Sequence, residues 1–412
     1  MSKRDITVGL DIGTTKICAL ICERGDSGEP EVIGVGTSVS AGLRRGVVVD
    51  IDAAAAAVSD AVARAENMSG CAVVSVTASL SGAHVSSMGS RGVVAVARPD
   101  REITSDDVAR VLEAARVVAI PPDREVVHVL PKEFIIDGCR GIKKPVGMSG
   151  IRLEVDTHII TGSATSIQNV KKSSARAGLE IDHLVLQPVA SAEAVLTPSE
   201  KELGVLLMDV GGGTTDIAVF VEGSPWHTSV IPVGGKHITN DIALVLRLPV
   251  PAAETLKVKR GCALASMVRE EEMCGHISGE ADIGTAAVPR RELCSIIEAR
   301  VTQIMEMVRA EVERAGLMGQ LPSGVVVTGG AAAMPGFVEA AQQALRLPAR
   351  LGIPTGVSGL ADVVSSPAHA AAVGLVKYSW EESAGRGHAP ASRRQAGFMT
   401  GVRQWFRDIF SP

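Results

Sequence analysis

The sequence predicts an α/β protein built from two related halves, with a small subdomain inserted into the first half and an amphipathic helix near the C-terminus. Three observations support this prediction. A glycine- and threonine-rich hairpin occurs twice, at Asp11–Lys16 and again at Asp209–Asp216. The sequence pattern changes over residues 84–161, between stretches that alternate strand-like and helix-like segments. Finally, residues 397–410 place their apolar side chains on one face of a helix.

The second hairpin is the most informative segment of the chain. An apolar strand from Leu206 leads into an aspartate, three glycines, two threonines and a second aspartate, and another apolar strand ends at Phe220. Two apolar segments joined by such a turn are typical of a β-hairpin. The glycines let backbone N–H groups surround a bulky anion, the hydroxyls add donors, and Asp209 and Asp216 can hold a hydrated divalent cation. The segment therefore predicts a phosphate-binding turn.

The first hairpin, Ile6–Leu20, repeats this arrangement, with Asp11 opening the turn. The candidate phosphate-binding residues are Gly13, Thr14, Thr15 and Lys16 in the first hairpin, and Gly211, Gly212, Gly213, Thr214 and Thr215 in the second. Either hairpin alone could be an ordinary glycine-rich turn, but their repetition indicates that two halves hold one nucleotide between them. No P-loop motif is present, and no dinucleotide-binding glycine fingerprint follows the first strand.

Length and composition exclude several classes of protein. At 412 residues the chain is long enough for two or three domains, and its formal net charge of −5 argues against a general nucleic-acid binder. The seven cysteines are scattered without a Cys-x-x-Cys pair, which is typical of reduced thiols in a cytosolic protein. No apolar run of about 18 residues occurs, so we expect no membrane-spanning segment.

Local periodicity predicts the elements of the first half. Strands are expected at 5–22 and 31–40, followed by an alanine-rich helix at 53–68 and a strand at 72–80. The inserted subdomain, 84–161, is expected to contain a strand at 92–97, a helix from Thr104 to Val117 and a Gly/Lys-rich loop at 138–150. The pattern then returns to a helix at 165–177 and a strand at 181–186.

The second half continues beyond its hairpin with the segment Val233–Leu244, which is expected to form a turn that leads into a helix. Further helices are expected at 252–259 and 291–315, the longer with an apolar stripe of 3.6-residue period. A strand, a glycine turn and a helix start follow at Gly324–Phe337, and an alanine-rich helix at 367–378 ends the globular part. Residues 379–396 are small or charged and are expected to form a flexible linker.

Two phosphate hairpins followed by Thr328-Gly-Gly-Ala make residues 5–378 similar to the actin, Hsp70 and sugar-kinase ATPase superfamily. The resemblance implies an actin-like two-domain fold with duplicated RNase H-like halves that binds ATP and Mg²⁺. Asp11 and Asp209 would hold Mg²⁺ through water, Gln187 would orient the attacking water for slow phosphoryl transfer, and Asp209 is a second candidate catalytic residue. The other implied nucleotide contacts are Gly234, Glu254, Lys257, Gly329, Gly330 and Met334. The Glu254–Lys257 pair could equally be a solvated surface ion pair.

The end of the chain concentrates aromatic side chains. Of only three tryptophans, one tyrosine and six phenylalanines in the whole chain, four lie within residues 398–410. One helical stripe would contain Phe398, Met399, Val402, Trp405, Phe406, Ile409 and Phe410. Large apolar side chains on one face and arginines on the other are typical of an interfacial membrane helix. The alternative is a helix that docks in a protein groove.

The insertion, the linker and the terminal helix together resemble the FtsA family of bacterial cell-division proteins. The match keeps its order along essentially the whole chain and includes Asp11–Lys16, Asp209–Asp216 and Lys259-Arg-Gly-Cys-Ala263. It implies an ATP-dependent, actin-like filament that assembles through the inserted subdomain and recruits other division proteins. This filament would anchor the FtsZ ring to the inner leaflet of the cytoplasmic membrane at the septum. The FtsZ C-terminal peptide would bind near Arg300, which matches an arginine of the family but could equally be a solvent-facing helix charge.

The resemblance also implies subdomain boundaries and leaves two alternatives. The expected segments are 1–83, 162–195 and 365–378 for the large subdomain of the first half, 84–161 for the insertion, 196–226 and 306–364 for the large subdomain of the second half, 227–305 for its small subdomain, 379–396 for the linker and 397–412 for the membrane helix. An actin-like scaffold for pilus or cell-wall machinery would differ only in its partner. A sugar kinase, which is less favoured, would need a substrate pocket with an aspartate base and no membrane helix.

Overall fold

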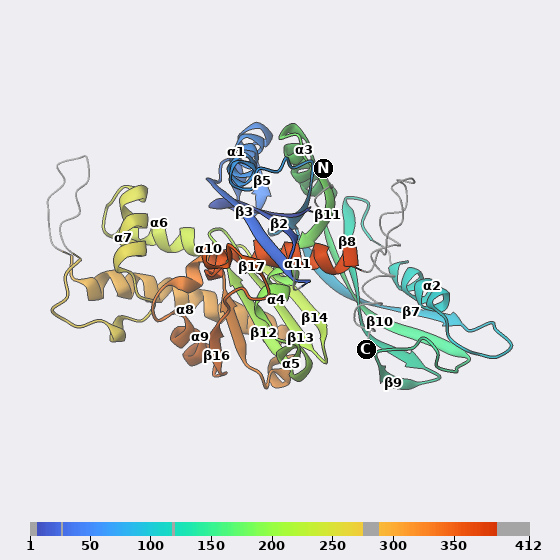
Figure 1. The fold of residues 1–412 in the computed structure, drawn as a ribbon. Helices are drawn as coiled ribbons and strands as arrows, with labels where there is room; N and C mark the ends of the chain where they lie inside the picture. The colour runs from blue at the N-terminus through green and yellow to red at the C-terminus, as the bar shows by residue number, and fades with distance from the viewer. Residues whose placement is uncertain (1–5, 26–27, 118–119, 275–287, 385–412) are drawn as a thin grey trace.

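The computed structural model describes residues 6–25, 28–117, 120–274 and 288–384. This part of the chain folds into two halves, each built around a large sheet, and an inserted subdomain with a sheet of its own (Figure 1). The predicted linker from residue 385 onward and the predicted helix at 397–412 lie outside the described residues. Within the described part, no helix combines the length and the apolar character that crossing a bilayer would require.

Five strands of each large sheet share one topology, which confirms the predicted duplication. The first-half sheet has the order β11 (Glu180–Leu186), β6 (Ser75–Leu80), β1 (Ile6–Ile12), β2 (Lys16–Arg24), β3 (Pro30–Val39) and β17 (Ser358–Gly359). The second-half sheet has the order β16 (Ala349–Leu351), β15 (Val325–Thr328), β12 (Val205–Val210), β13 (Thr215–Val221) and β14 (Ser224–Ile231). In each half, three antiparallel strands adjoin two parallel ones, β6 and β11 in the first and β15 and β16 in the second.

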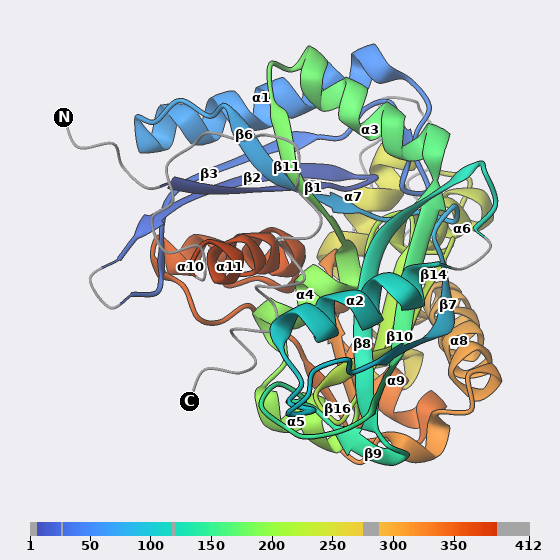
Figure 2. The same cartoon turned by 90° about the vertical axis from the view of Figure 1, so that its right-hand side faces the viewer.

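Helices cover the outer faces of the sheets and fill the space between them. α1 (Ile51–Ser69) and α3 (Ala164–Arg176) pack on one face of the first sheet, and α4 (Gln187–Val195) and α11 (Ala370–Ala384) lie on its other face, toward the second half (Figure 2). The second half also carries α5 (Pro198–Leu203), α6 (Gly235–Val245), α7 (Val250–Arg260), α8 (Arg290–Arg314) and α9 (Phe337–Leu345), and the short α10 (Ala361–Val364) precedes α11. Buried apolar residues of both sheets and of α11 form one core between the halves.

The sequence specifies α1 closely. Asp50 caps its first turn, since one carboxylate oxygen accepts the N–H groups of Asp52 and Ala53, each at 3.0 Å. Gly70 ends the helix in the left-handed conformation, with φ of +69°. On β3, a Cβ at Gly36 would lie 1.9 Å from the Ala61 carbonyl oxygen, so only glycine lets the alanine-rich helix pack this closely on the sheet.

The inserted subdomain is a four-stranded antiparallel sheet with one covering helix. Its strand order is β7 (Ser86–Ala95), β10 (Arg152–Ser163), β8 (Arg124–Ile136) and β9 (Cys139–Ile142). α2 (Ser105–Arg116) packs on one face over a core of buried apolar residues. The opposite face carries charged side chains.

The structure corrects three local predictions. The strand expected at 92–97 is β7, which already begins at Ser86, because pairing with β10 overrides the low strand propensity of its serines and glycines. The loop expected at 138–150 contains β9, which pairs with β8. The linker expected from 379 is helical as far as Ala384, and the Trp380 indole N–H, 3.2 Å from the Gly28 carbonyl oxygen, ties this extension to the first half.

Candidate functional site

The two hairpins meet at one cavity between the halves. The cavity has a volume of about 380 Å³. The predicted residues that line it are Asp11, Gly13, Thr14, Thr15, Lys16, Gln187, Asp209, Gly211, Gly212, Gly213, Thr214, Glu254, Lys257, Gly329, Gly330 and Met334. The fold thus gathers at one place residues from both hairpins, from α4 and α7, and from the turn after β15.

The tips of the two hairpins are in direct contact. A Cβ on Gly212 would lie 1.8 Å from Thr15 Oγ1, and a Cβ on Gly213 would lie 2.6 Å from Thr14 Oγ1. The Gly46 N–H donates to the Thr14 hydroxyl at 2.9 Å. In the sequence analysis these glycines are explained by the space that a bound phosphate needs. The structure adds a second reason, because the opposite hairpin approaches them too closely for a side chain.

Two lysines bring positive charge to the phosphate end of the cavity. Lys16 Nζ donates to the Ala368 carbonyl oxygen at 2.9 Å. From the second half, Lys236 Nζ donates to the Thr14 carbonyl oxygen, also at 2.9 Å. Each ammonium group is bonded to a backbone carbonyl oxygen and lines the cavity, so its charge can offset that of a phosphate group.

Two buried carboxylates face the same space. Asp209 Oδ2 accepts hydrogen bonds from Ser191 Oγ at 2.6 Å and from Gln187 Nε2 at 3.2 Å. Burial raises the pKa of Asp209 to about 6 in spite of these bonds. Burial also raises the pKa of Asp11, although Lys16 and a 2.9 Å hydrogen bond from Ser79 favour its charged form.

This donor set fits a hydrated Mg²⁺ ion. Burial disfavours the charged forms of Asp11 and Asp209, and an adjacent divalent cation would restore them. Mg²⁺ typically keeps several waters and is bound by one or two carboxylates together with substrate phosphates. Two aspartates beside a glycine-rich phosphate cradle supply that combination.

Close packing fixes the turn after β15 beside Asp209, and α7 supplies another part of the cavity wall. Gly329 has φ of +90°, and a Cβ there would lie 2.5 Å from Asp209 Oδ1, so the position requires glycine. On α7, Lys257 Nζ bonds Glu254 Oε2 at 2.7 Å, one helical turn apart as predicted. Both residues of this pair line the cavity, where the Lys257 side chain is largely buried and the Glu254 side chain is 44% exposed.

Two predicted contacts, Thr215 and Gly234, lie behind the cavity wall. The Thr215 hydroxyl is buried and donates to the Val233 carbonyl oxygen at 2.8 Å. A Cβ on Gly234 would lie 2.5 Å from the Gly211 carbonyl oxygen. In this arrangement both residues support the second hairpin from behind.

Arg300 is not among the residues that line the cavity. On α8, Arg300 Nε and Nη2 bond the two carboxylate oxygens of Asp241 at 2.6 and 2.8 Å, so the guanidinium is held against α6. The residues of the predicted membrane stripe, at 398–410, lie outside the described residues.

Among the cavity residues that the sequence prediction missed, four are glycines or polar residues: Gly46, Ser81, Gly235 and Lys236. The run Gly234-Gly-Lys236, at the start of α6, offered a local signal for the last two. Gly46 ends a turn with φ of +76°. No local pattern distinguishes Ser81, whose role depends entirely on residues of the other half.

Comparison with known proteins identifies the family. The family model for the cell division protein FtsA matches residues 206–374, and the model for the SHS2 domain inserted in FtsA matches residues 82–161. The cell division protein FtsA of Pseudomonas aeruginosa is 43% identical over 375 residues, which cover 91% of this chain and 89% of that relative. The chain belongs to the FtsA family. Membership confirms the prediction of an actin-like cell-division protein and identifies the insertion as an SHS2 domain.

Solved structures outside the FtsA family share the fold. The PilM–PilN type IV pilus biogenesis complex has a TM-score of 0.67 at 18% identity, covering 92% of this chain and 100% of that chain. MreB5 of Spiroplasma citri bound to ADP has a TM-score of 0.54 at 16% identity, covering 90% and 95%. At these identities the likeness concerns the fold alone.

Proposed function

We propose that this FtsA-family protein binds ATP and Mg²⁺ between its halves. The observation that carries the proposal is the cavity in which both hairpins, Lys16, Lys236 and two buried aspartates converge. The hairpins would surround the phosphates, and Asp11 and Asp209 would hold hydrated Mg²⁺. The turn at Gly329 would lie against the adenosine. The ADP bound to MreB5, which shares the fold, supports nucleotide binding by a protein of this fold.

The same residues would support slow hydrolysis. Bound Mg²⁺ would neutralise the charge of the phosphates. Gln187 is oriented by its hydrogen bond to Asp209, which leaves its amide oxygen to accept a hydrogen bond from a water in the cavity. We expect turnover to be slow, since a scaffold needs nucleotide occupancy more than product.

Blocking the cavity tests ATP binding. Gly330 lines the cavity, and a Cβ there would have only Ala368 Cβ nearby, at 3.9 Å. Gly330→Val should therefore fold, place its branched side chain in the cavity and weaken Mg²⁺–ATP binding by roughly a hundredfold or more. Gly319→Val is the matched control, because a Cβ at Gly319 meets nothing within 4 Å and this residue does not line the cavity. Calorimetric titration that gives equal affinities for both variants would refute the site.

We further propose that the chain forms head-to-tail filaments on the inner leaflet of the cytoplasmic membrane, through the inserted subdomain and the second half. A contact between different surfaces of identical chains does not close on itself and so propagates. The terminal segment at 397–412 would attach each subunit to lipid. Electron microscopy of the ATP-loaded protein on a lipid monolayer checks this, and only isolated particles at high surface density would count against it.

We propose that the FtsZ C-terminal peptide binds the small subdomain, residues 227–305. Through this contact the filament would link the FtsZ ring and other division proteins to the membrane. The side chain of Arg300 is about a quarter exposed and bonded to Asp241, so a peptide carboxylate could bind beside it or compete for it. Arg300→Glu should abolish peptide binding measured by fluorescence anisotropy. Arg309→Glu, an exposed arginine of the same helix, should bind like the wild type. Equal binding by both variants would place the peptide elsewhere.

A further inference from the structure

Ser81 connects the second phosphate hairpin to the point where the chain enters the inserted subdomain. It follows β6 directly, and the SHS2 match begins at the next residue. Its hydroxyl donates to Asp216 Oδ1 at 2.7 Å and lies 3.2 Å from Thr214 Oγ1. Ser81 is buried and also lines the cavity. One residue of the first half therefore contacts the second half, lines the cavity and directly precedes the insertion.

The backbone bends at Gly82, directly beside Ser81, and this bend is the candidate hinge of the inserted subdomain. Gly82 has φ of +131°, a conformation that side chains rarely adopt, and a Cβ there would lie 2.8 Å from His84 Nδ1. Among the described residues, neither ring nitrogen of His84 has a hydrogen-bond partner although both are buried. Arg124 Nη2 donates to the His84 carbonyl oxygen at 2.9 Å and to that of Thr161 at 3.0 Å, which holds the departing and returning strands together.

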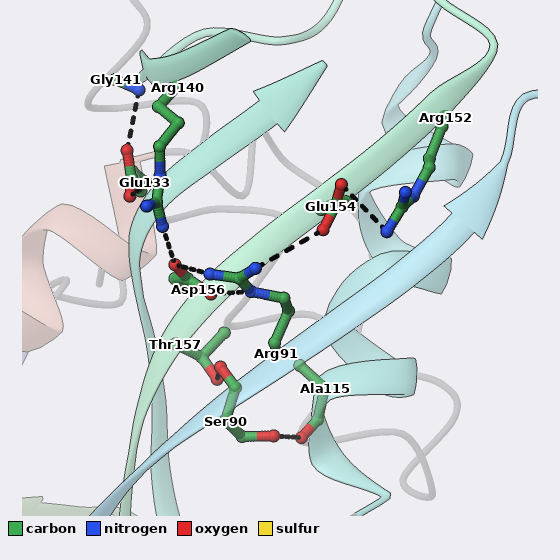
Figure 3. Close-up of polar contacts among 10 residues, drawn as sticks. All are labelled: Ser90, Arg91, Ala115, Glu133, Arg140, Gly141, Arg152, Glu154, Asp156 and Thr157. Carbon is green, nitrogen blue, oxygen red and sulfur yellow. Dashed lines mark hydrogen bonds and ion pairs between the residues drawn. The ribbon is translucent and has the colours of Figure 1, made fainter. Parts of the chain in front are cut away.

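The inserted sheet beyond this hinge is braced as one body. Arg91 of β7 makes two hydrogen bonds to Asp156 of β10, at 2.5 and 2.7 Å, and Arg140 of β9 reaches Asp156 at 2.8 Å (Figure 3). Arg140 also bonds Glu133 of β8 at 3.1 Å. These ion pairs cross all four strands on the face opposite α2, so a rotation at the hinge would carry the sheet as a unit.

The second half also contacts the inserted sheet away from Ser81, through β14, the strand that pairs with the hairpin strand β13. β13 and β14 pair so that Asp216 lies opposite Val230, two residues from Thr228. The Thr228 hydroxyl lies 2.9 Å from His158 Nε2, and its carbonyl oxygen accepts from Ser87 Oγ at 2.8 Å. A displacement of the second hairpin would therefore act on the inserted subdomain both at the hinge and at this polar contact.

We propose that Ser81 is a positioning residue that transmits nucleotide occupancy from the second hairpin to the orientation of the inserted subdomain. The proposal rests on the proposed ATP binding. The Thr214 hydroxyl now donates to Asp216 and lies beside the Ser81 hydroxyl, and a bound phosphate would accept the Thr214 hydrogen bond instead. The resulting movement of Ser81 would turn the inserted subdomain about Gly82 relative to β14. A local change at the site thereby becomes a rotation of the surface proposed for filament assembly.

Distance measurements between two spin labels test this coupling. Cys139 is an exposed natural thiol on β9, and Ser59→Cys adds an exposed site on α1, with Cys71→Ser removing the partly exposed thiol. Saturating Mg²⁺–ATP is used, so that a weakened affinity does not affect the result. We expect ATP to shift the distance in the otherwise wild-type chain and to leave it unchanged in Ser81→Ala. Ser90→Ala is the matched control, because this hydroxyl bonds the Ala115 carbonyl oxygen inside the subdomain at 2.7 Å (Figure 3), and it should shift like the wild type.

The outcomes separate this inference from the proposed function. Calorimetry on the same labelled proteins reports ATP binding independently of distance. Absence of binding to the wild type would refute the nucleotide site itself. Binding without a distance shift would overturn the coupling alone, as would a full shift in Ser81→Ala bound to ATP. Loss of the shift in Ser90→Ala as well would show that the effect does not come from the Ser81 contact, and would also overturn it.

Discussion

At the scale of single residues, two neighbouring glycines of the cavity differ in whether the protein's own packing requires a glycine there. Gly329 combines φ of +90° with a Cβ position 2.5 Å from Asp209 Oδ1 and 2.6 Å from the Val210 carbonyl oxygen. At Gly330 the nearest atom is 3.9 Å away, and its φ is not in the left-handed region. Both residues lie in one Gly-Gly pair, so the sequence alone cannot distinguish a glycine required by the backbone from one that leaves space for a ligand.

Alanine substitutions separate these two roles. Gly329→Ala should lower the free energy of unfolding by roughly 2–4 kcal/mol, because backbone strain and a collision with Asp209 add together. Gly330→Ala should change it by less than about 1 kcal/mol. Urea denaturation of the two variants measures both values, and equal losses would contradict the steric account of Gly329.

Cavity residues that belong to a local sequence motif were predictable, whereas those that reach the cavity through contacts between the two halves were not. Glycines and aspartates in the repeated hairpins have a recognisable spacing, so most of the cavity lining was expected. Lys236 stands in a glycine run that is visible in the sequence, but its contact with Thr14, 222 positions away, is not, and the contact of Ser81 with Asp216, 135 positions away, has no local signal. Such contacts exist only once the two halves are placed together.

At the scale of elements, Glu200 joins α5 to the edge of the second sheet. Its carboxylate accepts the Thr197 N–H at 2.8 Å, which caps α5, and binds Arg350 of β16 at 2.6 and 2.7 Å. The bonds from Arg350 are the main cause that lowers the pKa of Glu200 to about 2. The charged form is therefore favoured by folding.

A pH series tests this junction. Since the folded pKa lies below the unfolded value of about 4.3, the stabilisation is complete above that value and is lost as the pH falls toward 2. Glu200→Gln should lower the free energy of unfolding by about 1–2 kcal/mol at pH 7, a range reduced because Arg350 is partly exposed. In thermal or urea unfolding, the free energy of unfolding of this variant should also decrease less than that of the wild type as the pH falls from about 4.5 to 2. A variant with the same pH profile as the wild type would rule out this carboxylate as the source.

Elements with strong local signals were predicted closely, whereas those that depend on tertiary contacts were not. The capped helix α1 and the two hairpins follow from cap residues, glycines and alternating apolar strands. The start of β7, the short β9 and the last turns of α11 are stabilised by β10, β8 and the first half, respectively, and no local pattern marks these partners.

At the scale of the whole molecule, each subunit of the proposed filament would have one nucleotide cavity and one weak attachment to the membrane. Seven apolar side chains at 398–410 would contribute on the order of 10 kcal/mol on entering lipid, and ordering the backbone costs about 1 kcal/mol or more per residue. The small net value predicts weak attachment for one chain and firm attachment for a filament, because assembly multiplies the contacts.

Liposome co-sedimentation tests the attachment. Trp405→Glu should leave the protein in the supernatant with anionic vesicles, because a charge on the apolar stripe opposes insertion, while its affinity for ATP stays at the wild-type value. Arg403→Lys should sediment like the wild type, since it keeps the positive charge. Vesicle binding that persists in Trp405→Glu would mean that another surface is the anchor.

The central claim is that the two related halves hold one ATP between them, and a crystal structure of the protein with a non-hydrolysable ATP analogue and Mg²⁺ tests it most directly. The account predicts phosphates between the hairpins at 13–16 and 211–214, Mg²⁺ reached through water by Asp11 and Asp209, and adenosine against the turn at Gly329. Nucleotide bound at any other surface, or a cavity that stays empty at saturating analogue, would contradict it.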